Sequence, residues 1–136
     1  MATQNNVSPA KRKYLGSNAR IALAKRHYAD YVQYVHMGRW KRARHLDLVC
    51  EKLESKSMTV TETFPSFYLG KNPEKRVIEI SYSGDLAQQF GKRNRDKVEE
   101  FGPALFGHTI SQVQATKTNW NLDNGMGGMI SVGIGG

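Results

Sequence analysis

Hydrophobic side chains recur at helical spacing between Ser17 and Gly38. This stripe consists of Ile21, Ala24, Tyr28, Tyr31, Val32 and Val35. It predicts one amphipathic helix that begins at residue 17 or 18 and ends at the glycine. A second apolar stripe predicts another helix over residues 41–54. A third helical stretch is expected over residues 57–69, where Pro65 should end or kink it.

The second half of the chain mixes strand and helix patterns. Residues 76–82 (RVIEISY) are rich in β-branched side chains and predict a buried strand, with Glu79 facing a polar layer. Ser83 is expected to cap a helix that runs to Phe101 and stops at the Gly-Pro pair that follows. Further strands are expected over residues 109–112, 115–122 and 129–134. Helices that alternate with strands indicate an α/β fold.

Composition narrows the class of protein. The 136 residues suffice for one domain, or for a part of a larger domain. No apolar run approaches the roughly 20 residues that span a bilayer, so no membrane partner is expected. A single cysteine excludes an internal disulfide framework.

The net charge is concentrated at one end of the chain. Residues 1–56 contain 12 Lys and Arg against 4 Asp and Glu, whereas residues 57–136 contain 8 of each kind. This asymmetry favours an anionic partner for the N-terminal region, such as nucleic acid or nucleotide phosphate. A solvated helix face and a flexible basic arm over residues 1–16 explain the charge equally well.

Several segments, in order, resemble the ATPase domain of phage terminase large subunits, the motors that package viral DNA. KSMTVTETFPSFYLG is similar to the end of a Walker A loop and its helix. ISYSGDLAQQFGKRNR resembles the strand and arginine-bearing helix that follow, and TNWNLDNGMGGMISVGIGG resembles the hairpin and glycine step before Walker B. The resemblance covers residues 17–136 and implies a P-loop NTPase-like three-layer sandwich with a partly antiparallel edge. It assigns residues 17–55 to the adenine side and residues 56–136 to a partial ATPase core.

Two departures from the family pattern stand out. The segment that would hold the glycine-rich head of Walker A is missing between Ser55 and Lys56. The sequence also stops at Gly136, before the apolar strand with paired acids that would be Walker B. The chain alone is therefore not expected to hydrolyse ATP, and its status as an enzyme stays open.

The resemblance implies roles for individual residues in binding ATP and Mg²⁺. Lys56 would reach the β- and γ-phosphates, and the hydroxyl of Ser57 would bind Mg²⁺. Arg93 and Arg95 would supply a charge that stabilises the transferring phosphoryl group, in part across subunits. The adenine side would be lined by Tyr31, Gln33, Tyr34, Trp40 and His45.

Each of these residues also has an ordinary structural explanation. Lys56 can be a surface lysine, because a lysine without the glycine turn is a weak anion site. Tyr31 and His45 are equally suited to a core or a helix cap. The basic residues near Arg93 and Arg95 can pair with Asp96, Glu99 and Glu100 on a solvated helix face.

Two functions follow from these alternatives. The first is part of a terminase large subunit that packages double-stranded DNA into procapsids by ATP hydrolysis. The resemblance then implies a homo-oligomeric ring that meets the portal protein and the small terminase subunit, in the cytoplasm of an infected bacterium. The alternative is a catalytically inactive basic module that binds nucleic acid or another subunit.

Overall fold

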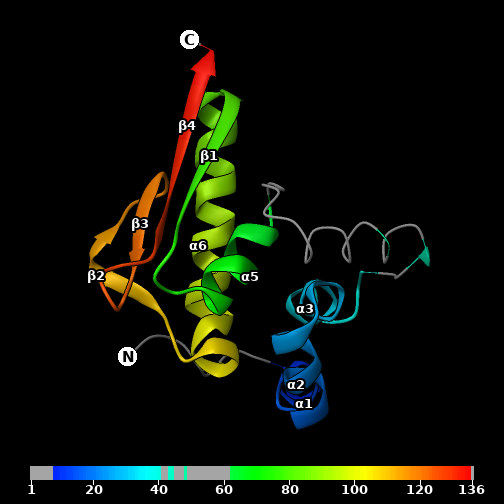
Figure 1. Ribbon diagram of the computed structural model, residues 1–136. Coiled ribbons are helices and arrows are strands. Elements are labelled where there is room, and N and C mark those ends of the chain that lie inside the picture. Colours follow the sequence, from blue (N-terminus) through cyan, green and yellow to red (C-terminus); the bar gives the residue numbers. More distant parts are fainter. Residues whose placement is uncertain (1–7, 41–42, 45–47, 49–61, 136) are drawn as a thin grey trace. The chain divides into compact units, whose positions relative to one another are not determined.

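The computed structural model describes residues 8–40, 43–44, 48 and 62–135. The chain divides into two compact units, Met1–Ser55 and Lys56–Gly136. Helices α1 to α3 belong to the first unit; helices α5 and α6 and strands β1 to β4 belong to the second (Figure 1). The described part of the chain is therefore an α/β protein with a mixed sheet.

Three short helices make up the described part of the first unit: α1 (Pro9–Leu15), α2 (Asn18–Arg26) and α3 (Tyr28–Val35). The single helix expected from Ser17 to Gly38 is wrong, because His27 takes an extended backbone (φ −122°, ψ 130°) that separates α2 from α3. The apolar stripe is nevertheless inward on both helices: five of its six members are buried, and Ile21 is half-buried. The helix expected over residues 41–54 falls mostly outside the described residues.

The second unit contains a four-stranded sheet in the order β1-β4-β3-β2. Its strands are β1 (Arg76–Ser83), β2 (Ile110–Ala115), β3 (Asn119–Leu122) and β4 (Gly128–Gly135). β1 and β4 are parallel, whereas β3 runs antiparallel to both β4 and β2. The expected antiparallel edge is therefore present within an α/β arrangement. Among the described residues, α6 packs against β1 and β4, and Val77 and Met129 lie in the core on that side of the sheet.

Helices α5 (Phe64–Lys71) and α6 (Gly84–Phe106) pack together, and α6 also packs against β1 and β4. The core between helices and sheet consists of Leu69, Val98, Ile110, Trp120, Leu122 and Met129. Ser83 caps α6 as expected, since its Oγ accepts the Leu86 N–H at 3.2 Å. Burial of these apolar side chains supplies the main stabilisation of the unit.

β1 lies where it was expected, but its apolar side faces out. Glu79 and Ser81 are buried on the helix side, whereas Ile78, Ile80 and Tyr82 are exposed. The expectation of a buried strand is therefore wrong for its aliphatic side chains. A period of two allows either set of side chains to face inward, so the strand pattern alone does not decide which side is buried.

Three predicted boundaries also differ from the structure. α6 continues past Pro103 to Phe106, because Leu105 is buried and Gly107 ends the helix in a left-handed conformation (φ +72°). Pro65 begins α5 at its first turn, where a proline is favoured, and does not kink it. The strand expected over residues 115–122 is interrupted by a turn in which the Asn119 N–H donates to Thr116 Oγ1 at 3.0 Å.

Candidate functional site

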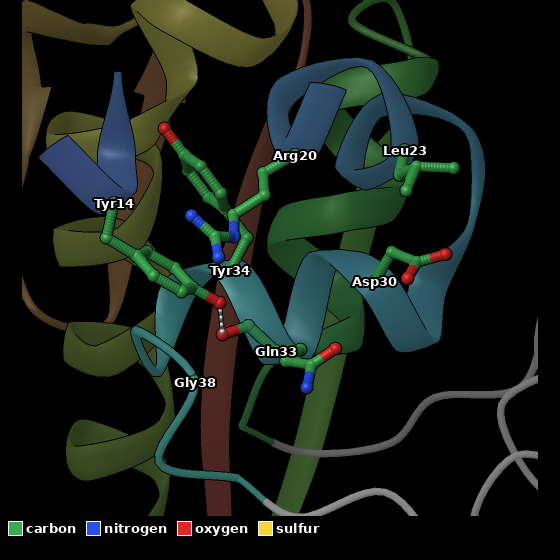
Figure 2. A pocket seen from close by; sticks show the side chains of 7 residues that line it. All are labelled: Tyr14, Arg20, Leu23, Asp30, Gln33, Tyr34 and Gly38. Carbon is green, nitrogen blue, oxygen red and sulfur yellow. Dashed lines mark hydrogen bonds between the residues drawn. The ribbon is translucent and has the colours of Figure 1, made fainter. Parts of the chain in front are cut away.

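A cavity of about 320 Å³ lies among the helices of the first unit. Seven residues line it: Tyr14, Arg20, Leu23, Asp30, Gln33, Tyr34 and Gly38. They come from all three helices and from the segment after α3 (Figure 2). The volume is at the lower end of the range of small-molecule sites.

Tyr14 closes one side of this cavity. Its hydroxyl donates to the carbonyl oxygen of Gln33 at 3.3 Å, and the Arg20 guanidinium lies 4.1 Å from the centre of its ring (Figure 2). Gly38 has φ +75°, and a Cβ atom there would lie 3.3 Å from the Tyr14 ring. The glycine therefore allows the chain to turn after α3 directly beside the aromatic ring.

Tyr34 joins the first and third helices at the same place. Its hydroxyl donates to the carbonyl oxygen of Leu15 at 2.7 Å, and its ring centre is 6.3 Å from that of Tyr14. Burial, and then the nearby Tyr14, raises the pKa of the Tyr34 hydroxyl above its usual value. Tyr34 therefore remains a neutral hydrogen-bond donor at neutral pH.

The lining combines three kinds of chemistry. Two tyrosine rings and the planar guanidinium of Arg20 offer surfaces on which a flat heteroaromatic group can stack. The Gln33 side chain has both amide donors and a carbonyl acceptor, and Asp30 supplies a carboxylate. This set suits a nitrogenous base with hydrogen-bonding edges, and Arg20 adds a positive charge for an anionic substituent.

The structure brings two of the five expected adenine-side residues to this cavity, Gln33 and Tyr34. Tyr31 is buried in the first unit, with its ring stacked 6.4 Å from that of Tyr28, so it is a core residue. Trp40 is half-buried and is not part of the cavity wall. His45, Lys56 and Ser57 lie outside the described residues.

Both candidate arginines of α6 have partners within their own unit. Arg93 forms an ion pair with Glu62, and both side chains are about half exposed. Arg95 donates to Asp96 Oδ1 at 3.0 Å and to the carbonyl oxygen of Ala115 at 3.0 Å. The expected pairing within the helix is thus present for Arg95, and Arg93 pairs with a residue that the sequence did not indicate.

Asp96 is the acceptor for two cations on α6, Lys92 and Arg95. Burial alone would raise the pKa of its carboxyl, but hydrogen bonds from Lys92 and Arg95 and their charges bring it below its usual value. At the next residue, burial lowers the pKa of Lys97, and the acidic neighbours Glu62, Asp96 and Glu100 oppose that change. This face of α6 is therefore an ion-pair network.

The sequence analysis missed Tyr14, Arg20 and Asp30 as wall residues of the cavity. It assigned residues 1–16 to a flexible arm, whereas residues 9–15 form α1. A local signal was present in Ser8-Pro9, because serine is a favoured helix cap and proline a favoured first residue. In the structure Ser8 Oγ accepts the Lys11 N–H at 3.3 Å.

No family model, curated protein or solved structure matches this chain. Within the described ranges, none of the helices has the length and apolar character needed to cross a bilayer. The same ranges contain no group of three or more His, Cys, Asp or Glu side chains placed to hold a metal ion.

Proposed function

We propose that this chain is part of a viral terminase large subunit, the ATPase that powers packaging of double-stranded DNA into procapsids. The observation that carries the proposal is the cavity of the first unit, which joins Gln33 with two tyrosine rings and the Arg20 guanidinium. The order of the family-like segments in the sequence supports it, as does the strand β1 followed at once by α6.

The volume and the lining of the cavity support the proposal that it holds the base of ATP. Gln33 would read the edge of adenine, the aromatic and guanidinium planes would stack on the ring, and Arg20 would favour the negatively charged ligand. Phosphate and Mg²⁺ contacts would come from Lys56 and Ser57, in keeping with the family resemblance. The portal protein, the small terminase subunit and further copies in a ring are the partners that this proposal implies, at the procapsid in the infected host.

Mg-ATP titrated into the full chain, followed by calorimetry, tests the proposal. Saturable binding is expected, with adenosine competing for the same site. Gln33→Ala should weaken the affinity about tenfold, which corresponds to the loss of roughly one hydrogen bond. Gln88→Ala is the matched control, since Gln88 is an exposed amide on α6.

Two results would count against nucleotide binding at this cavity. One is the absence of binding at millimolar Mg-ATP, and the other is an equal response of the Gln33 and Gln88 variants. Inorganic triphosphate that competes while adenosine does not would place the contacts on the phosphates alone.

The charge of the first unit favours a second candidate function, a nucleic-acid-binding module without catalysis. Seven exposed cations lie in its described part: Arg12, Lys13, Arg20, Lys25, Arg26, Arg39 and Arg44. Binding to duplex DNA that weakens steeply with salt and does not depend on nucleotide would support this module over the ATPase.

A further inference from the structure

A single asparagine side chain joins the turn before β1 to the turn before β4. The Nδ2 amide of Asn124 donates to the carbonyl oxygen of Pro73 at 2.7 Å. Its Oδ1 accepts the backbone N–H groups of Met126 at 3.0 Å and Gly127 at 3.2 Å. Both the donor and the acceptor of one side-chain amide are therefore used to connect the segments that lead into the two parallel strands.

The backbones of the two turns lie very close together at this contact. A Cβ atom on Gly127 would lie 2.2 Å from the Pro73 carbonyl oxygen. The Gly128 N–H donates to the carbonyl oxygen of Lys75 at 3.3 Å, and the parallel register then begins with Arg76 beside Gly128. The Asn124 hydrogen bonds therefore act at the point where β1 and β4 start to pair.

The residue after Asn124 is a glycine, and this is the only Asn-Gly pair in the sequence. An asparagine loses its side-chain amide most readily before a glycine, because no Cβ atom hinders the approach of the next backbone nitrogen. Gly125 is exposed and has φ +71°, and Asn124 is half-buried. The sequence thus places the most reactive asparagine context of the chain at the contact between the two turns.

We propose that Asn124 is a site of spontaneous deamidation, and that this reaction breaks the contact between the two turns. The backbone nitrogen of Gly125 attacks Cγ of Asn124 and closes a succinimide ring. The bond from Cγ to Nδ2 breaks, and Nδ2 leaves as ammonia together with the proton of the Gly125 amide. Water then opens the ring at either of its carbonyl carbons, which gives aspartate or isoaspartate. The reaction needs no other reactant than water and does not depend on the proposed ATPase activity.

The folded structure controls the rate of this reaction. The Gly125 N–H donates to the carbonyl oxygen of Leu122 at 3.0 Å, and three hydrogen bonds hold the Asn124 amide. The Gly125 nitrogen must lose its proton and approach Cγ, so the attack requires the turn to open locally. Deamidation is therefore slower in the folded chain than in the unfolded chain.

The product does not restore the contact with Pro73. An aspartate carboxylate has acceptor oxygens and no donor, so an oxygen would stand against the Pro73 carbonyl oxygen without a hydrogen between them. Isoaspartate also lengthens the backbone of the turn. Because ammonia is lost, a transient opening of the turn is converted into a permanent loss of this hydrogen bond.

Incubation of the full chain in mildly alkaline buffer, followed by trypsin digestion and tandem mass spectrometry, tests the reaction. Asn119, Asn121 and Asn124 lie in one tryptic peptide, which begins after Lys117. Replacement of NH2 by OH should accumulate at Asn124 at least about tenfold faster than at the other two asparagines, because the residues that follow them carry a Cβ atom. The same incubation in concentrated urea should give a higher rate at Asn124, because the turn is then open.

Asn124→Asp reproduces one product directly. Its unfolding equilibrium constant, from urea denaturation, should be about tenfold larger than that of the wild type, in keeping with the loss of one hydrogen bond. Gln112→Glu is the matched control, since it makes the same change from amide to carboxylate at an exposed position on β2. Its unfolding equilibrium constant should stay near that of the wild type.

An Asn124 side chain that stays intact in the folded chain would overturn the proposal, as would Asn119 or Asn121 reacting equally fast. A rate that urea leaves unchanged would contradict control by the turn. Equal stability of Asn124→Asp and the wild type, or an equal loss in Gln112→Glu, would contradict the broken contact. Should Asn124→Asp fail to fold, the deamidated fraction of the wild-type chain takes its place; its amide hydrogen exchange over residues 74–77 must exceed that of the intact fraction.

Discussion

The indole Nε1 of Trp120 donates to the carbonyl oxygen of Gly91 at 3.0 Å. This buried hydrogen bond joins β3 to the middle of α6, and it requires the two backbones to approach closely. A Cβ atom on Gly91 would lie 2.1 Å from the carbonyl oxygen of Lys117 and 2.8 Å from Ser131 Oγ. Gly91 is thus the point at which the helix meets the sheet without a side chain between them.

Gly91→Ala should destabilise the second unit strongly, although alanine is the better helix former. The added methyl group cannot fit beside the Lys117 carbonyl, so α6 must move away from the sheet and weaken the contact with Trp120. We expect a loss of about 3 kcal/mol or more in the free energy of unfolding, measured by urea denaturation. Gly84→Ala is the control: nothing lies within 4 Å of its Cβ position, and no loss is expected.

Glu79 should make the stability of the second unit depend on pH. The side chain is buried, and its Oε2 and the nearby Ser131 Oγ have no hydrogen-bond partner among the described residues. Burial raises the pKa of this carboxyl above its ordinary value of 4.5, and the Ser131 side chain offsets part of the increase. The folded state therefore binds the proton more tightly. The free energy of unfolding is therefore highest at a pH below the ordinary pKa of the carboxyl, and it falls as the pH rises through the folded-state pKa.

Glu79→Gln removes this dependence, because the amide does not ionise. At neutral pH the variant should be more stable than the wild type by about 1–3 kcal/mol, the range for relieving an unsatisfied buried group. Thermal unfolding from pH 4 to pH 8 measures both effects. Glu74→Gln, at an exposed carboxylate, is expected to follow the wild type; a flat wild-type profile would contradict the argument.

Local chemistry explains which parts of the fold could be predicted. The start of α6 could be predicted from the capping residue Ser83. The position of β1 could be predicted from its run of β-branched side chains. Which side of β1 faces the helices depends on the neighbouring elements. The side chains that face inward include Glu79 and Ser81, and hydrophobic alternation cannot predict that a polar side of a strand is buried. The end of α6 likewise depends on the burial of Leu105, which outweighs the local effect of Pro103.

The candidate site was only partly predictable for the same reason. Gln33 and Tyr34 could be named, because both lie in residues 17–55, which the family resemblance assigns to the adenine side. Tyr14 and Arg20 could not, because each contributes to the cavity only once α1 and α2 have folded back against α3 through the Tyr34–Leu15 hydrogen bond. Contacts between residues 19 positions apart arise only when the helices pack together, and neither composition nor periodicity predicts that packing.

Tyr34→Phe should loosen α1 from the rest of the first unit. The change removes the hydrogen bond to the Leu15 carbonyl and leaves that oxygen without its side-chain donor, which costs about 1 kcal/mol. Amide hydrogen exchange in α1 should accelerate accordingly, which mass spectrometry measures. Tyr82→Phe, in which the lost hydroxyl belongs to an exposed side chain, should leave the exchange rate in α1 unchanged.

Arg95 and Arg93 should differ sharply in their effect on stability. Arg95 is 20% exposed and joins α6 to the end of β2 through the Ala115 carbonyl, so Arg95→Met should cost about 1–3 kcal/mol. Arg93 pairs with Glu62 at the surface, so Arg93→Met should stay within about 1 kcal/mol of the wild type. Urea denaturation of both variants measures the difference. Equal losses in the two variants would mean that the hydrogen bond from Arg95 to the Ala115 carbonyl contributes nothing to stability.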